Sequence, residues 1–115
     1  MRLLILLLSL PSALWAADFQ LLKDDVALTR HEVVEMTERG LLTFYEGGQS
    51  RYAADGAYSY TYDQGATAFG AFSIGEDGVI CIEYQNGRSR CDRFVNSHGR
   101  LVMLTEDGQR FAIRP

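Results

Sequence analysis

The sequence predicts a mainly β protein: an antiparallel meander of about seven or eight short strands that forms a small barrel or a bent sheet, with one N-terminal helix. Three observations predict it. From Leu41 onward, short runs of β-branched and aromatic residues alternate with glycine-bearing turns. The turns recur roughly every 8–13 residues, which is typical of antiparallel strands joined in sequence. Proline is absent between Ser12 and Arg114, so no expected strand is interrupted.

The segment before the meander predicts an extended lead-in and one helix. Residues 17–27 show no hydrophobic period and are expected to be extended. Thr29 followed by Glu32 fits a capping box, and Gly40 stands where a left-handed C-terminal glycine belongs. We therefore predict a helix from Thr29 to about Arg39. The apolar residues that can share one flank of it are Leu28, Val33, Val34 and Met36.

The expected strands are the segments between the turns. A chain of this length supports one small core, so residues 17–40 and the meander, residues 41–115, are expected to form a single domain. The predicted strands cover residues 41–45, 50–53, 57–62, 67–74, 79–84, 88–95, 100–105 and 109–114.

Residues 1–16 have the layout of a cleavable secretory signal peptide. One positive charge, Arg2, precedes a short leucine-rich run, which is followed by a proline and small residues up to Ala16. The run is too short for a membrane span, which needs about 20 residues. We expect cleavage after Ala16 and a periplasmic or secreted mature chain. The alternative is a buried N-terminal helix.

The charge of the chain excludes nucleic acid from the expected partners. The sequence has 11 Lys and Arg residues against 15 Asp and Glu residues, a net charge of −4, and loss of Arg2 makes the mature chain more acidic. Nucleic-acid binding needs clustered positive charge, and the sequence has no basic tract. No second apolar segment follows the signal, so no stable membrane insertion is expected after cleavage.

Cys81 and Cys91 are expected to form a disulfide, because an even pair of cysteines in an exported chain meets an oxidising environment. A metal site is the alternative. It would need two further ligands, and the histidines that could supply them, His31 and His98, lie far apart in sequence. We therefore expect no metal and no other cofactor.

The register of the hairpin between the cysteines depends on its turn. A two-residue turn at 86–87 would point Cys81 and Cys91 to opposite faces, although it would pair Glu83 with Arg90 across the strands. A three-residue loop at 85–87, with Gly87 left-handed, would place the cysteines directly opposite each other. A bridge that closes so short a loop contributes roughly 2–3 kcal/mol, more than a surface ion pair. This term favours the three-residue loop.

Several short motifs between residues 40 and 114 carry a resemblance. They are Gly47-Gly48-x-Ser50-Arg51-Tyr52, Asp55-Gly56-x-Tyr58-Ser59-Tyr60, Asp77-Gly78-x-x-Cys81, and Gly87 followed by Arg90-Cys91-Asp92. With these motifs the chain resembles a family of small exported, mostly β bacterial proteins of unknown function that is common among alphaproteobacteria. The resemblance implies an exported β domain and implies no chemistry.

Two groups of side chains are candidate ligand-binding residues. Tyr58, Tyr60 and Tyr62 alternate along one strand and share one face, where exposed rings could stack on sugars or peptides. The alternative is that the rings fill the barrel interior. The second group consists of arginines, which could bind a carboxylate or phosphate or could instead pair with acidic side chains. Its members are Arg51, Arg88, Arg90 and Arg93.

Catalytic residues are not expected. His31 and His98 have no obvious serine or cysteine partner, which argues against nucleophilic catalysis. The acid pairs Asp24-Asp25 and Glu76-Asp77 lie in expected loops. Acidic side chains in loops more often accept local hydrogen bonds than form catalytic pairs or bind calcium.

The sequence therefore favours a non-enzymatic binding module of the cell envelope that holds a small molecule or glycan in the barrel, or a peptide across the tyrosine face. The first alternative is an accessory subunit or inhibitor acting through loops such as 85–88. The second is a small periplasmic enzyme that uses an acid pair. An open pocket lined by tyrosines would favour small-ligand binding, and two buried carboxyl groups meeting in a cleft would favour the enzyme.

Overall fold

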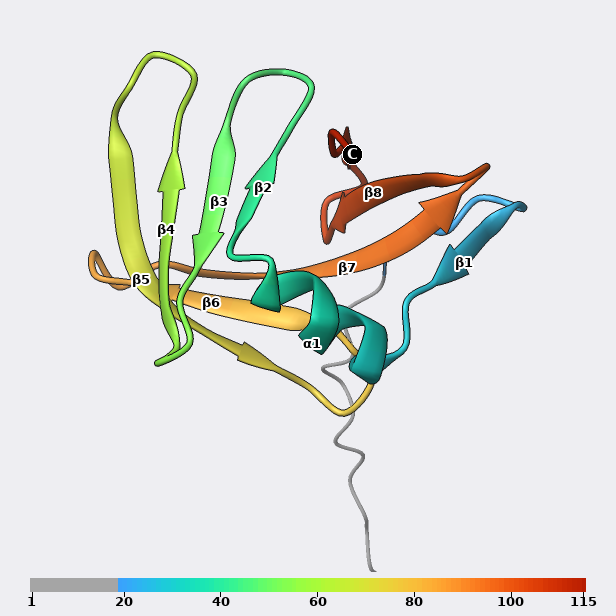
Figure 1. The fold of residues 1–115 in the computed structure, drawn as a ribbon, viewed down its shortest axis with the longest axis horizontal. Coiled ribbons are helices and arrows are strands. Elements are labelled where there is room, and N and C mark those ends of the chain that lie inside the picture. Colours follow the sequence, from blue (N-terminus) through green and yellow to red (C-terminus); the bar gives the residue numbers. More distant parts are fainter. Residues whose placement is uncertain (1–18) are drawn as a thin grey trace, which may run out of the picture.

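The chain is mainly β, as predicted. A computed structural model describes residues 19–115, so the signal peptide expected at residues 1–16 lies outside the described part. Strands β2 to β9 follow one another as neighbours in a curled antiparallel sheet that forms a half-barrel (Figure 1). They are β2 (Leu41–Thr43), β3 (Gln49–Tyr52), β4 (Ala57–Thr61), β5 (Thr67–Ile74), β6 (Ile80–Tyr84), β7 (Ser89–Ser97), β8 (Arg100–Thr105) and β9 (Arg110–Ala112).

The two ends of the curled sheet meet. Phe44, just after β2, forms an isolated antiparallel bridge with Ile113, just after β9. The amide of Tyr45 donates to the carbonyl of Ala112 at 3.1 Å, and the amide of Arg114 donates to the carbonyl of Thr43 at 2.7 Å. These bonds join the first and last strands of the meander. Fewer backbone groups are therefore left unpaired at the edges of the sheet.

The predicted helix is confirmed as α1 (Arg30–Glu38). The hydroxyl of Thr29 accepts from the Glu32 amide at 3.2 Å, and the Glu32 carboxylate accepts from the Thr29 amide at 2.9 Å, which completes the capping box. Val33 and Met36 are buried and join the core inside the sheet, next to which α1 lies (Figure 1). No helix within residues 19–115 is long and apolar enough to cross a membrane.

The lead-in differs from the expectation at its end. It is extended, but residues Asp25–Ala27 also form a strand, β1, that pairs with β7 through Ala27 and Val95. The pairing exists because β7 runs on past the end of β6 and leaves an edge that β1 covers. Asp25 is also bound by both terminal nitrogens of Arg110, at 2.8 and 3.0 Å, which lowers the pKa of its carboxyl.

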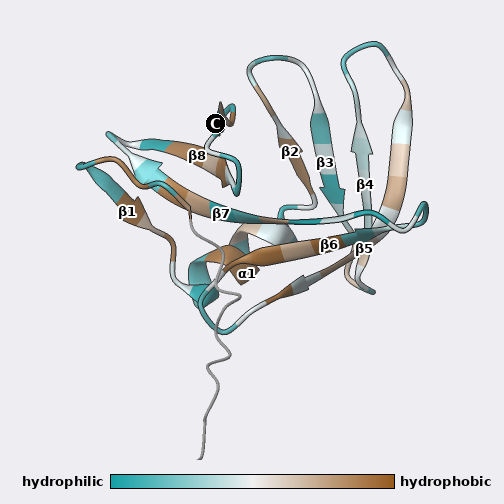
Figure 2. Cartoon of the chain, turned by 180° about the vertical axis from the view of Figure 1, so that it is seen from behind, coloured by the Kyte–Doolittle hydropathy of each residue, from teal (hydrophilic) through white to brown (hydrophobic). Residues whose placement is uncertain are grey.

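The core lies on the concave, inner face of the sheet and is mostly apolar and aromatic. Figure 2 shows hydrophobic residues gathered along β6, where it passes α1. A smaller cluster on the outer face, formed by Val95, Val102 and Leu104, packs with Phe19 and Ala27. The buried residues of the inner core are Val33, Met36, Leu42, Phe44, Tyr52, Tyr58, Ile80, Ile82, Phe94, Met103 and Ile113.

The disulfide hairpin has the predicted register. Cys81 and Cys91 face each other and are bonded. The amide of Tyr84 donates to the carbonyl of Arg88 at 2.8 Å, and Gly87 is left-handed with φ 89°, so the loop is the three-residue one. The rejected register would have paired Glu83 with Arg90. In the observed register, Glu83 faces Ser89 and Arg90 faces Ile82.

Replacing both Cys81 and Cys91 with alanine is expected to lower the free energy of unfolding by roughly 2–3 kcal/mol, because the bridge constrains a short loop in the unfolded chain. Urea unfolding of the oxidised wild type and of the double variant measures the difference. The reduced wild type is the control and should match the double variant. A loss below about 0.5 kcal/mol would contradict the chain-entropy argument.

Candidate functional site

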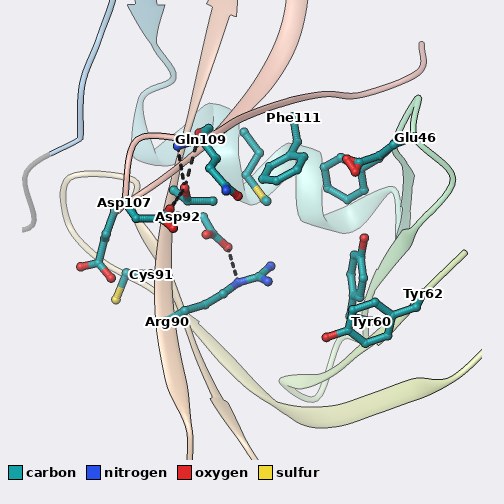
Figure 3. Close-up of a pocket in the computed structure, with 13 residues that line it drawn as sticks. Glu46, Tyr60, Tyr62, Arg90, Cys91, Asp92, Asp107, Gln109 and Phe111 are labelled. Carbon is teal, nitrogen blue, oxygen red and sulfur yellow. Dashed lines mark hydrogen bonds and ion pairs between the residues drawn. The ribbon is translucent and has the colours of Figure 1, made fainter.

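The predicted tyrosine strip divides between core and surface. Tyr58 is buried, as the core interpretation expected, whereas Tyr60 is half-buried and Tyr62 is 47 % exposed. The rings of Tyr60 and Tyr62 pack edge to face with centroids 4.9 Å apart. These two rings lie at the mouth of a pocket at the end of the half-barrel (Figure 3). The pocket therefore receives Tyr60 and Tyr62 but not Tyr58.

This pocket has a volume of about 530 Å³ and is open to solvent. One wall consists of the Tyr60–Tyr62 pair, the opposite wall comes from the β8–β9 turn, and Arg90 and Asp92 of β7 lie at the base between them (Figure 3). A volume in this range is typical of small-molecule sites. The lining residues are Phe44, Glu46, Tyr60, Tyr62, Arg90, Cys91, Asp92, Met103, Thr105, Glu106, Asp107, Gln109 and Phe111.

Arg90 and Asp92 form an ion pair at the base of the pocket. Their side chains lie on the inner face of β7, two residues apart, and the Arg90 Nε donates to Asp92 Oδ2 at 3.0 Å. The Arg90 side chain is 31 % exposed, whereas that of Asp92 is fully buried. The pair therefore presents its cationic side to the pocket and keeps its anionic side in the protein.

The buried carboxylate of Asp92 has only part of its charge and hydrogen-bonding capacity compensated by partners. Its Oδ1 is buried and has no hydrogen-bond partner among the described residues. Burial raises the pKa of the carboxyl to about 6, although Arg90 opposes this shift with its charge and its hydrogen bond. A buried acceptor without a partner costs roughly 1–3 kcal/mol, and such groups are concentrated at functional sites.

Aromatic rings hold the Arg90 guanidinium in place. Its carbon lies 5.9 Å from the Tyr60 ring centroid and 6.0 Å from the Tyr84 centroid, within cation–π range. One terminal nitrogen donates to the Tyr58 hydroxyl at 3.4 Å, and that hydroxyl also shares a hydrogen bond with Ser50 at 2.9 Å. The remaining N–H groups of Arg90 form no hydrogen bond within residues 19–115, so they can meet a ligand.

The position of Tyr60 depends on Gly48 in the turn between β2 and β3. A Cβ built on Gly48 would lie 1.8 Å from the Tyr60 hydroxyl, so the phenol packs directly on the glycine backbone. The same turn carries Glu46, whose charge adds to burial in raising the pKa of Tyr60. The β2–β3 turn therefore places one aromatic and one acidic side chain on the same wall of the pocket.

The predicted arginine group does not assemble into one site. Arg90 alone among its members lines the pocket. Arg93 points to the outer face, where it pairs with Asp77 at 3.3 Å and lies over the ring of Phe19. Arg51 and Arg88 are exposed, and Arg51 alternates with the inward-facing residues of β3. The pairing interpretation is thus confirmed for Arg90 and Arg93.

Acidic side chains surround the entrance. Glu46, Glu106 and Asp107 are exposed residues of the pocket lining and form no ion pair with any described residue. Together with Asp92 they outnumber the single cation, Arg90. Sequence reasoning missed these acids as site residues. For Asp92 a signal was available, the alternation in β7, which places Asp92 on the same face as Arg90.

The histidines and paired acids lie elsewhere. His31 is near Glu35 on the exposed side of α1, and His98 is near Asp24. Asp77 and Asp25 bind arginines, Arg93 and Arg110 respectively, so each acid pair contributes one member to an ion pair. Within the described residues, the side chains of Asp25 and Asp92 are both fully buried, but Asp92 is the one that lines the pocket.

Comparison of the chain with known protein families, with curated proteins and with solved structures found no match. The resemblance to small exported bacterial β proteins therefore stays a hypothesis.

Proposed function

We propose that this chain is a non-enzymatic binding module of the cell envelope, acting in the periplasm, which holds a small organic ligand in the pocket at the open end of the half-barrel. The observation that carries the proposal is the pocket itself: aromatic walls surround a guanidinium with unused donors and a buried carboxylate with an unused acceptor. Concave apolar sites with a few convergent polar groups are the usual form of ligand sites.

Two features favour binding over catalysis. The pocket acids other than Asp92 are exposed, so no second buried carboxyl stands beside Asp92 to act as a matched acid or base in the described structure. One carboxylate oxygen of Asp92, Oδ2, already accepts a hydrogen bond from Arg90. The arrangement supplies recognition groups and an aromatic wall, which are what a binding protein needs.

N-Phenylnaphthylamine, a neutral dye that fluoresces in apolar sites, tests the pocket without reference to ligand charge. We expect saturable binding of one dye per chain. Replacing Tyr62 with alanine should weaken dye affinity about fivefold, because an exposed aromatic contact contributes roughly 1 kcal/mol. Fluorescence titration of the purified mature protein measures both quantities.

Phe69→Ala is the matched control. Phe69 is 54 % exposed, close to the 47 % of Tyr62, but it lies on β5 outside the pocket lining. Its replacement should leave dye affinity unchanged. Non-saturable binding, or an equal loss in Phe69→Ala and Tyr62→Ala, would show that the dye binds exposed rings at random and would overturn the proposal.

A further inference from the structure

The base of the pocket holds a guanidinium with free donors, and a carboxylate oxygen without a partner lies buried next to it. The free N–H groups of Arg90 require an acceptor, and a carboxylate fits a guanidinium because it takes two parallel hydrogen bonds. Oδ1 of Asp92 requires a donor. The other oxygen of that carboxylate is only 3.0 Å from Arg90 Nε, so the required donor and acceptor must lie close together on the ligand.

The acidic entrance decides between an anion and a zwitterion. Glu46, Glu106 and Asp107 would repel a simple anion from Arg90, and Arg90 would repel a simple cation from the acids. A ligand that carries an ammonium and a carboxylate satisfies both. Glu106 and Asp92 line the same pocket, and the charge of Glu106 adds to burial in raising the pKa of the Asp92 carboxyl.

The walls indicate the body of the ligand. Tyr60, Tyr62, Phe111 and Met103 line the pocket. Aromatic faces and edges of this kind pack against an aromatic or large apolar side chain. The volume of about 530 Å³ leaves room for a molecule of that size with its polar end at the base.

We propose that the pocket binds a free α-amino acid with an aromatic or large apolar side chain, with its carboxylate on Arg90 and its ammonium toward Asp92 and the acidic entrance. The proposal rests on the proposed binding function. Because Asp92 Oδ1 is out of contact with solvent, the ammonium reaches it only by moving the side chains that cover it. The exposed acids, which need no such movement, supply the longer-range attraction.

Isothermal titration calorimetry at pH 7.5 with three probes that share a phenyl group tests the ligand class. Phenylalanine carries both charges, 3-phenylpropionate only the carboxylate, and phenethylamine only the ammonium. We expect phenylalanine to bind at least about tenfold more tightly than either analogue, because each analogue leaves one polar group at the pocket base without a partner.

A double variant, Glu46→Gln with Glu106→Gln, separates the charge contributions. It should weaken binding of phenylalanine and phenethylamine about threefold to fivefold and leave 3-phenylpropionate unchanged or slightly tighter. Glu83→Gln is the control, because Glu83 is also exposed but lies outside the pocket lining. Its affinities should match those of the wild type.

Equal affinity for phenylalanine and one of the analogues would overturn the amino-acid proposal. So would the absence of phenylalanine binding to protein that binds the dye saturably, and in that case the pocket function would stand without this ligand class. Absence of dye binding would overturn the pocket function itself, and the amino-acid proposal with it.

Discussion

Arg90→Leu is expected to lower the free energy of unfolding by about 3 kcal/mol at pH 7.5, because removing one partner leaves the other as an uncompensated buried charge. The other partner is Asp92, which has a fully buried side chain and loses the hydrogen bond that its Oδ2 accepts. Tyr58 loses a donor at the same time. Urea unfolding at several pH values measures the loss.

The loss should depend on pH with a definite sign. The folded-state pKa of Asp92, about 6, is above its ordinary value of 3.8, so the stabilisation that comes from holding this proton is complete below about pH 4 and is lost as the pH rises through 6. Arg90 opposes the raised pKa, so its removal raises it further. At pH 5 the carboxyl is protonated with or without Arg90, and the loss should shrink to about 1 kcal/mol from missing hydrogen bonds.

A double variant isolates the buried charge. Arg90→Leu combined with Asp92→Asn should be more stable at pH 7.5 than Arg90→Leu alone, because a neutral amide needs no cation beside it. A loss for Arg90→Leu that is the same at pH 5 and pH 7.5 would mean that Asp92 is not the cause, and packing of the guanidinium among the tyrosines would then account for it.

Local patterns predicted most of the fold. Glycine-bearing turns set the strand boundaries to within a few residues, and the Thr29–Glu32 capping box set the start of the helix. The disulfide register followed from loop closure. Each of these features depends on residues close together in the chain, where period and turn chemistry are informative.

The candidate site could be predicted only in part, because it joins distant strands. The alternation in residues 57–62 predicts Tyr60 and Tyr62 as candidates, and the hairpin predicts Arg90. Glu46 and Phe111 reach the same pocket only because the sheet curls until β2 and β9 meet. The curl depends on the twist that accumulates over all the strands, which no local pattern reports.

Gly70→Ala is expected to lower the free energy of unfolding by about 3 kcal/mol, because overpacking that displaces backbone falls at the upper end of such losses. Gly70 lies in β5 opposite both Tyr58 of β4 and Tyr84 of β6. A Cβ there would lie 2.3 Å from the carbonyl oxygen of Glu83 and 2.9 Å from the Cα of Tyr84. Strands β5 and β6 would have to move apart where the sheet bends.

Gly75→Ala is the matched control, since Gly75 also lacks a left-handed φ and follows the same strand. Its added Cβ would be 3.0 Å from a carboxylate oxygen of Asp77. That side chain is exposed and is held by a surface ion pair with Arg93 and by the Val79 amide, so displacing it should cost less than about 1 kcal/mol. Thermal or urea unfolding compares the two. Equal losses would show that the close approach to the β6 backbone does not explain the loss at Gly70.

Gly70→Ala should also change the structure of the pocket base. The rings of Tyr58 and Tyr84 meet at a centroid distance of 6.1 Å beside Gly70, and both contact Arg90. Separating β5 from β6 would separate these rings and release the guanidinium that they hold. Dye affinity in Gly70→Ala should therefore fall under conditions where the variant is still folded, whereas Gly75→Ala should keep it. Unchanged dye affinity in folded Gly70→Ala would mean that the bend and the pocket base are independent.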